Sequence, residues 1–275
     1  MVFHTDARLR PDGEKGLLVN TLAVGGNYYR ERAQLWEIQA LPRTRPVAGN
    51  VALGEKFQKL AAALTDFSKV GQASSLSPSQ RKREKRDRLE ACPTLPDWKK
   101  QIHQMRLRIE KERTPRGQEE LAIKTGKGGL MDAEFIAQVL CLENGWQEAN
   151  TLRVLERARE AVGVQSLDCV PARGTLKREL QQLTRGDFEK LLDNYRHLRR
   201  IEGILRRWSY EGETVLPDDP APYYRVSVRC GFATPEEFGK ALAKWRKAIR
   251  EVYEKVFNAK PLGRQEENRI RKSCG

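Results

Sequence analysis

Apolar residues recur at helical spacing through much of the chain beyond residue 97. Within residues 98–113, Ile102, Met105 and Ile109 fall on one stripe, and Lys and Arg occupy most of the other positions. This spacing predicts a helix. Comparable stripes predict further helices over residues 150–162, 175–183, 187–208 and 235–256.

The last of these helices has a clear start in the sequence. Thr234, Pro235, Glu236 and Glu237 form a capping box with proline at the first helical position. The apolar stripe that follows passes through Phe238. Together these patterns predict an all-helical bundle domain over residues 98–260.

The first 67 residues have a different pattern. Residues 2–10 alternate between polar and apolar positions, which predicts a strand, and the short apolar run at residues 16–19 predicts a second one. Two helices are also predicted here, over residues 28–40, with Tyr28 and Trp36 buried, and over residues 55–67.

Charged side chains share one face of this N-terminal part. Asp6, Arg8 and Arg10 lie on the polar side of the first predicted strand. Arg43 and Arg45 stand two positions apart in a segment predicted to be extended. A carboxylate and four arginines on one surface are typical either of an ion-pair network or of a functional site.

A glycine-rich turn, KTGKGGLMDAEF at residues 124–135, leads directly into an apolar helical stripe. Glycines at a helix start let the backbone approach a ligand, and the first N–H groups and the helix dipole favour an anion. Lys124 and Lys127 strengthen this field. The turn matches neither the Walker A loop nor the dinucleotide fingerprint. A phosphate site and a simple acid-capped helix start therefore both fit.

Asp132 and Glu134 follow the glycines within the first helical turn. Two carboxylates there either satisfy the helix dipole or hold a divalent cation beside a phosphate. They lie about 200° apart around a helix, so they cannot both face one cleft. We expect Asp132 to be the functional one, because it is nearer the glycines.

Composition narrows the class of ligand but does not identify it. The 275 residues carry 51 basic and 37 acidic side chains, a net charge of +14, which favours an anionic ligand or partner. The excess is spread along the chain. The composition of residues 68–97, rich in Ser, Pro, Lys and Arg, predicts a solvated linker or insertion rather than an RNA contact. Residues 261–275 are predicted to form a basic tail.

Cysteine usage and hydropathy indicate a cytoplasmic protein. The five cysteines are far apart, and none has zinc-site spacing, so we expect reduced thiols. The sequence shows no signal-peptide pattern, and no apolar run approaches the roughly 18 residues of a membrane span. We therefore expect no membrane association.

Four blocks in this order resemble one family: TDARLRPDGEKGLLV, WEIQALPRTRPVAG, IKTGKGGLMDAEFIAQ and NYRHLRRIEG. They are similar to the glutamine synthetase adenylyltransferase (glutamate-ammonia-ligase adenylyltransferase) family, whose helical part is shared with PII uridylyltransferases. The resemblance covers nearly the whole chain and is weakest over residues 68–97. Four blocks in register are far more specific than any one of them.

The resemblance implies a nucleotidyltransferase fold of the polymerase-beta type. In that family three carboxylates hold two Mg²⁺ ions, and AMP moves from ATP to a tyrosine of glutamine synthetase, while a related module removes it by phosphorolysis. Asp6 matches the third carboxylate, the catalytic metal ligand. The implied nucleotide-binding residues are Arg8, Arg10, Arg43, Arg45, Lys124, Gly126, Lys127, Gly128, Gly129 and Asp132.

The family's Gly-Ser turn and D-x-D block have no counterpart in the chain. We therefore expect an α+β, mostly α protein: a truncated nucleotidyltransferase sheet remnant over residues 1–67, the 68–97 linker, and the helical domain. Lacking two of the three metal carboxylates, it should be inactive without the missing upstream half of the module. The sequences of its DARLRP and GGLMDAEF blocks are closer to those of the adenylylating module than to those of the adenylyl-removing module. The alternative is a non-catalytic basic helical protein that docks glutamine synthetase, a PII-like signal protein or RNA, with nucleic acid the least expected of these partners.

Overall fold

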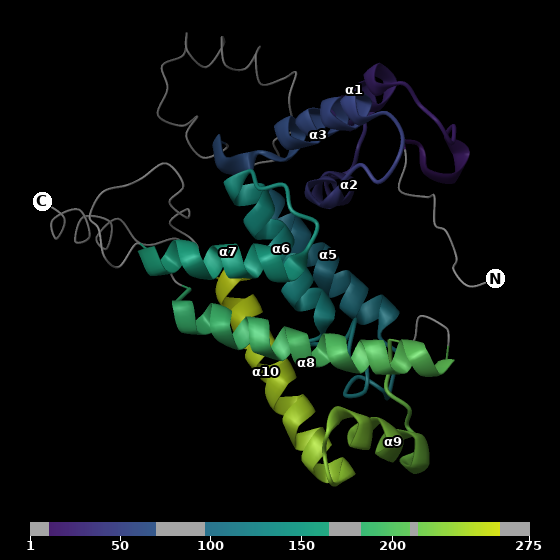
Figure 1. Ribbon diagram of the computed structural model, residues 1–275, viewed down its shortest axis with the longest axis vertical. Helices are drawn as coiled ribbons and strands as arrows, with labels where there is room; N and C mark the ends of the chain where they lie inside the picture. The colour runs from purple at the N-terminus through teal and green to yellow at the C-terminus, as the bar shows by residue number, and fades with distance from the viewer. Residues whose placement is uncertain (1–10, 70–96, 165–182, 210–213, 259–275) are drawn as a thin grey trace, which may run out of the picture. The chain divides into compact units, whose positions relative to one another are not determined.

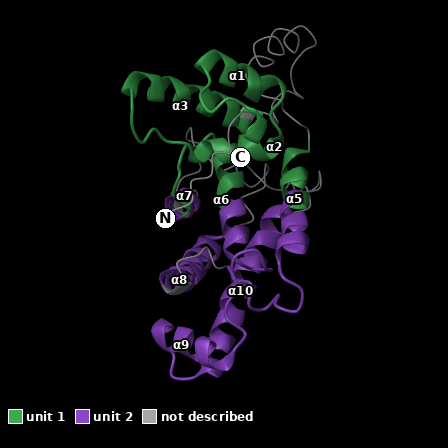
Figure 2. Ribbon diagram, turned by 90° about the vertical axis from the view of Figure 1, so that its right-hand side faces the viewer, with its two compact units in different colours: residues 1–104, 137–151 green, residues 105–136, 152–275 purple. Residues whose placement is uncertain are grey.

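The computed structural model describes residues 11–69, 97–164, 183–209 and 214–258, and Figure 1 shows these ranges as helices joined by loops. No strand occurs among them. The chain divides into two compact units (Figure 2). Unit 1 comprises residues 1–104 and 137–151, and unit 2 comprises residues 105–136 and 152–275. The mostly helical character predicted from the sequence is confirmed, whereas a sheet is not found in the described ranges.

Unit 1 is built around three helices, α1 (Leu22–Glu31), α2 (Leu35–Ala40) and α3 (Val51–Thr65), with short 3-10 turns η1 (Gly13–Lys15), η2 (Leu41–Arg43) and η3 (Phe67–Lys69). Both α1 and α2 pack on α3. The core that they share includes the nearly inaccessible side chains of Ile38, Leu41 and Leu64. Thr21 and Asn50 cap α1 and α3 by accepting hydrogen bonds from backbone N–H groups one turn on.

The single helix predicted over residues 28–40 is two helices. Gln34 is extended at φ −78° and ψ 156°, and its N–H donates to the Glu37 carboxylate at 2.7 Å, which starts α2 afresh. The other Glu37 oxygen accepts from the Tyr28 hydroxyl at 2.6 Å. Tyr28 is buried as expected, but Trp36 is 44% exposed, because the new helix places it on the outer side of α2.

The strand predicted at residues 16–19 is wrong. These residues form bends and irregular structure, and Leu17, Leu18 and Val19 are exposed. The Gly16 N–H closes a turn onto the Gly13 carbonyl instead of pairing with a neighbouring strand. The first predicted strand, over residues 2–10, lies outside the described residues.

The remaining helices are α5 (Trp98–Arg113), α6 (Leu130–Asn144), α7 (Thr151–Val164), α8 (Arg185–Ser209), α9 (Pro220–Cys230) and α10 (Pro235–Phe257). α5 has the predicted bounds, and the division between the units falls inside α5 and α6. α8 and α10 pack against each other, and α9 contacts both (Figure 1). The helix predicted over 175–183 lies, except for Leu183, outside the described residues, and α9 was not predicted.

The apolar stripe of α8 is buried as predicted, and that of α10 is buried except for the half-buried Trp245. On α8 these residues are Phe188, Leu191, Tyr195, Leu198 and Leu205. Thr234 caps α10 by accepting the Glu237 N–H, with proline in the first helical turn, so the predicted N-cap and proline are present. No helix in the described part of the chain has the length and apolar character needed to cross a membrane.

The start of α8 is held by a reciprocal cap. The Asp187 N–H donates to the Thr184 hydroxyl oxygen at 3.1 Å, and Asp187 Oδ2 accepts from the Thr184 N–H at 2.9 Å. Lys255 Nζ on α10 donates to Asp187 Oδ1 at 2.7 Å. Burial alone would raise the pKa of Asp187, but the bonds from Lys255 and Thr184 outweigh it and leave the pKa below its ordinary value.

A buried ion pair joins α5 to the start of α6. Arg106 and Asp132 are both fully inaccessible, and Arg106 Nε lies 2.7 Å from Asp132 Oδ1. Neither of these two atoms makes a well-directed hydrogen bond, so the contact is chiefly ionic. Arg250 of α10 lies 3.3 Å from the other Asp132 oxygen and 3.1 Å from Glu110. Two cations and two carboxylates therefore balance inside unit 2.

Asp132→Asn should destabilise the protein strongly, because it leaves the buried Arg106 charge without its nearest partner. Removing one member of a buried pair costs roughly 3–5 kcal/mol. Urea unfolding measures this. Glu134→Gln, two residues on and only half-buried, is the matched control and should change the free energy of unfolding by less than about 0.5 kcal/mol. Equal effects of the two substitutions would contradict a structural role for the pair.

Asp187→Asn should destabilise the protein at neutral pH and not at strongly acid pH. A depressed carboxyl pKa contributes stability above the ordinary Asp value, and that contribution is lost as pH falls through the folded-state pKa. Because Lys255 is half-exposed, the neutral-pH loss should be about 1 kcal/mol. Unfolding midpoints between pH 7 and 3 test this, with the exposed Asp193→Asn as control. A difference that persists undiminished at pH 3 would contradict it.

Candidate functional site

The glycine turn stands at the N-terminus of α6, as predicted, but its N–H groups are not free. The Leu130 N–H donates to the Ile123 carbonyl at 2.9 Å and the Met131 N–H to the Lys124 carbonyl at 3.1 Å. The Gly129 N–H donates to the Gly126 carbonyl at 3.0 Å. The sequence argument expected unpaired donors at this helix start. In the structure the turn satisfies these donors within the chain.

Gly128 is required by close packing against α10. Gly128 has φ +71°, and a Cβ at this position would collide with the backbone carbonyl of Arg246. The Gly128 N–H donates to Asp132 Oδ2 at 2.9 Å. Nucleotide binding by Gly126, Gly128, Gly129 and Asp132 stays a prediction; their contacts in the structure are those of a packed turn.

Arg246 fixes the path of the turn, and the sequence analysis missed it. Its Nε donates to the Lys127 carbonyl at 3.0 Å, its Nη2 to the Glu119 carbonyl at 2.9 Å, and its Nη1 to the Glu120 carbonyl. Burial lowers the pKa of this guanidinium, and the nearby Glu120 carboxylate opposes that shift. The available signal was its spacing, because Arg246 stands between Leu242 and Ile249 on the buried stripe of α10.

Asp132 occupies a structural position rather than an open one. It is the residue that we expected to face a ligand, yet its carboxylate is enclosed by Arg106 and Arg250. Glu134, which we expected to be structural or solvated, is half-buried and accepts a 3.4 Å hydrogen bond from the Tyr195 hydroxyl. The geometry thus favours the capping interpretation of the acidic residues in this turn.

The two lysines of the turn remain the accessible basic groups. Lys127 is exposed and lines a cavity of about 360 Å³ together with Lys247, Arg250 and Glu251. Its backbone is fixed by Arg246 while its ammonium group reaches solvent. Lys124 is partly exposed, and its Nζ lies 4.0 Å from Glu202 Oε1. A fixed backbone with a free ammonium group is suited to binding an anion.

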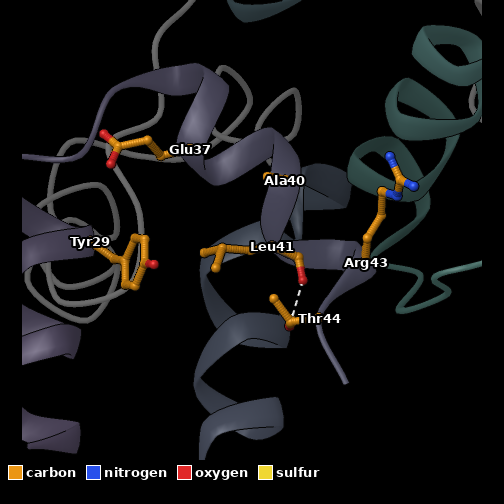
Figure 3. A pocket seen from close by; sticks show the side chains of 6 residues that line it. All are labelled: Tyr29, Glu37, Ala40, Leu41, Arg43 and Thr44. Carbon is orange, nitrogen blue, oxygen red and sulfur yellow. Dashed lines mark hydrogen bonds between the residues drawn. The ribbon is translucent and has the colours of Figure 1, made fainter. Parts of the chain in front are cut away.

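Arg43 and Arg45 line one cavity of unit 1, of about 1020 Å³, beside the apolar residues Leu53 and Phe57. Arg43 is not in an extended segment as predicted, because it ends the 3-10 turn η2. It also borders a smaller cavity of about 410 Å³. Figure 3 shows Leu41 in this smaller cavity, with Arg43 on its far side from Tyr29 and the Thr44 hydroxyl bonded to the Leu41 carbonyl.

The predicted metal ligand and basic pair, Asp6, Arg8 and Arg10, lie outside the described residues. Within the described ranges, no group of three or more His, Cys, Asp or Glu side chains is placed to hold a metal ion. Asp132 does not fit Mg²⁺, because both of its oxygens already face buried guanidinium groups. Asp6 therefore stays the predicted ligand.

Two family models match the chain in succession. The model for glutamate-ammonia ligase adenylyltransferase matches residues 1–60, and the model for GlnD PII-uridylyltransferase matches residues 97–257.

Curated relatives cover both regions in one alignment. The bifunctional glutamine synthetase adenylyltransferase/adenylyl-removing enzyme of Streptomyces avermitilis is 30% identical over 258 residues, 93% of this chain and 22% of that enzyme. The enzyme of the same name from Cutibacterium acnes is 29% identical over 93% of this chain and 22% of its own length. That from Mycolicibacterium smegmatis is 32% identical over 85% of this chain and 20% of its own length. The chain thus spans about a fifth of the length of these relatives.

The matches fall on the blocks that carried the resemblance in the sequence, and they extend across the helical part of the structure. The chain belongs to the glutamate-ammonia ligase adenylyltransferase family, whose helical part is shared with PII uridylyltransferases.

Proposed function

We propose that this chain takes part in the transfer of AMP from ATP to a tyrosine of glutamine synthetase, as part of an adenylylating module. The observation that carries the proposal is the succession of the two family matches on one chain, with relatives aligned over 93% of it. The relatives' name includes adenylyl removal as well as transfer. The amino-acid sequences of the blocks around Asp6 and the glycine turn are closer to the adenylylating module, which supports AMP transfer rather than removal.

The chain's own contribution is the positioning and charge neutralisation of the nucleotide. Transfer of a phosphorus group depends mainly on holding the phosphates in line and stabilising their charge. Lys127 supports this role best among the described residues, because Arg246 fixes its backbone while its side chain stays accessible. Arg8, Arg10, Arg43 and Arg45 supply further cations in the N-terminal part.

When bound, Mg²⁺ supplies neutralisation of the triphosphate and activation of the attacking oxygen. Asp6 is the carboxylate that we propose to hold it. A single carboxylate cannot fix two ions, so the 275-residue chain should bind ATP by itself without labelling glutamine synthetase. Asp132 stays a predicted nucleotide-binding residue, although its carboxylate is paired with Arg106 and Arg250 in the structure.

Lys127→Ala should weaken ATP binding about tenfold or more without unfolding the protein. One charge-assisted hydrogen bond is worth roughly 1.5–3 kcal/mol. Calorimetric titration with ATP measures the change. Lys240→Ala, which removes another exposed lysine, from α10, is the control and should bind like the wild type. An unchanged affinity of Lys127→Ala for ATP would indicate that the turn has a purely structural role.

A chimera tests the transfer reaction itself. This chain replaces the matching segment of the Streptomyces avermitilis enzyme, and radiolabelled AMP transfer to glutamine synthetase and AMP removal are both measured. We expect the chimera to keep transfer, and Lys127→Ala to reduce it about tenfold. AMP removal, the second activity, reports whether the chimera has folded. Retained transfer without removal would place the chain in the removing module, and loss of transfer with removal intact would contradict the proposal.

A further inference from the structure

One buried carboxylate on α8 holds three cations. Glu202 is 2% exposed, and its Oε1 accepts from Arg206 Nη2 at 2.7 Å while its Oε2 accepts from Arg199 Nη1 at 2.5 Å. Lys124 Nζ, from the glycine turn, lies 4.0 Å from Oε1. Arg199 and Glu202 belong to the block NYRHLRRIEG, to which the proposed function assigns no role.

The charge of this cluster exceeds what the carboxylate needs. A single guanidinium neutralises one buried carboxylate. Within the described residues, none of the three cations is in ion-pair contact with a second carboxylate, so three positive charges share one negative charge. The remaining net charge of two raises the local potential, which a purely structural pairing does not require.

The geometry leaves the cations available to a ligand. Arg199 and Arg206 are two helical turns apart on one face of α8, with Glu202 between them, so both side chains converge on it. Their side chains are 46% and 51% exposed, and Lys124 is 33% exposed. Each guanidinium has five N–H donors and uses few of them on Glu202. The unused donors are therefore pre-oriented and solvent-accessible.

The neighbouring arginines of α8 are arranged differently. Arg196 pairs with Glu156 at 2.8 Å and with Asp193 at 3.4 Å, which balances its charge. Arg200 donates to the Arg229 carbonyl and Arg207 to the Gly203 carbonyl. Arg200 and Arg207 are thus held by neutral backbone carbonyls, whereas in the Glu202 cluster one buried carboxylate fixes two accessible guanidinium groups close to Lys124.

We propose that Arg199, Arg206 and Lys124, held in place by the positioning residue Glu202, bind the phosphate chain of a nucleoside triphosphate. Planar guanidinium groups match phosphate oxygens in bidentate geometry, and a pre-oriented pair loses little side-chain entropy on binding. The assignment of the ligand to a nucleotide rests on the proposed function. The anion site itself rests on the charges and contacts of unit 2.

Calorimetric titration of the full chain with inorganic triphosphate and with ATP tests the site. Arg199→Gln and Arg206→Gln should each weaken triphosphate binding about tenfold. Arg196→Gln removes the same charge from the same helix and should leave the affinity within about twofold. Equal weakening by all three variants would show a diffuse field and overturn the site, as would a wild type that does not bind triphosphate. Comparing ATP with triphosphate then shows whether the adenosine adds affinity.

Glu202→Gln separates a positioning role from general electrostatics. The substitution makes the cluster more positive, so a diffuse field would bind triphosphate more tightly. Because the arginines lose their anchor, we expect binding about tenfold weaker instead. Circular dichroism checks that α8 persists; if it does not, the two arginine variants decide alone. Unchanged or tighter binding by a folded Glu202→Gln would overturn the positioning role.

The outcomes also separate this inference from the proposed function. If Lys127→Ala weakens ATP binding and the arginine variants do not, the Glu202 site is wrong while the proposed function stands. If the arginine variants lose triphosphate binding but the chimera transfers no AMP, the anion site stands and the proposed function fails.

Discussion

The arrangement of unit 2 depends on the buried contact between Arg106 and Asp132. Both groups are out of reach of water, so neither can lose the other without leaving a charge that the interior does not solvate. The same carboxylate accepts the Gly128 N–H, and the same guanidinium donates to the Gly126 carbonyl at 3.1 Å. The path of the glycine turn is therefore fixed from inside the bundle. Several amide groups of the turn are already bonded within the chain, which leaves its lysine side chains as the accessible groups.

The helices that the sequence predicted well are those whose burial is one-sided. The stripes of α5, α8 and α10 repeat over several turns, and a repeat of that length requires no knowledge of the partner element. The glycine turn shows the opposite case. Its composition predicted a helix start correctly, but its packing depends on Arg246, which donates to the Lys127 carbonyl from 119 positions away in the chain. The environment of Asp132 could not be predicted for the same reason, because its partner Arg106 is 26 positions away in the chain.

Unit 1 shows how local signals mislead where their partners are not close in sequence. The run of Leu17, Leu18 and Val19 has strand character, yet a strand requires a neighbour to bond with, and none lies in the described ranges. Trp36 has the spacing of a buried residue only if the helix continues through Gln34. The hydrogen bond from the Gln34 N–H to Glu37 starts a second helix there, and this changes which face of the sequence points inward.

The net charge of +14 combines two physically different populations of cations. Arg106 and Arg246 are buried and already donate to backbone carbonyls, so their charge holds the fold together and cannot recruit an anion from solvent. Arg199 and Arg206 are anchored by one buried carboxylate but remain half-exposed. Anchoring removes rotamer freedom before a ligand arrives, and exposure leaves donors unused. Only cations with both properties combine selectivity with accessibility, which is why the charge of Glu202's neighbours matters more for function than the total charge of the chain.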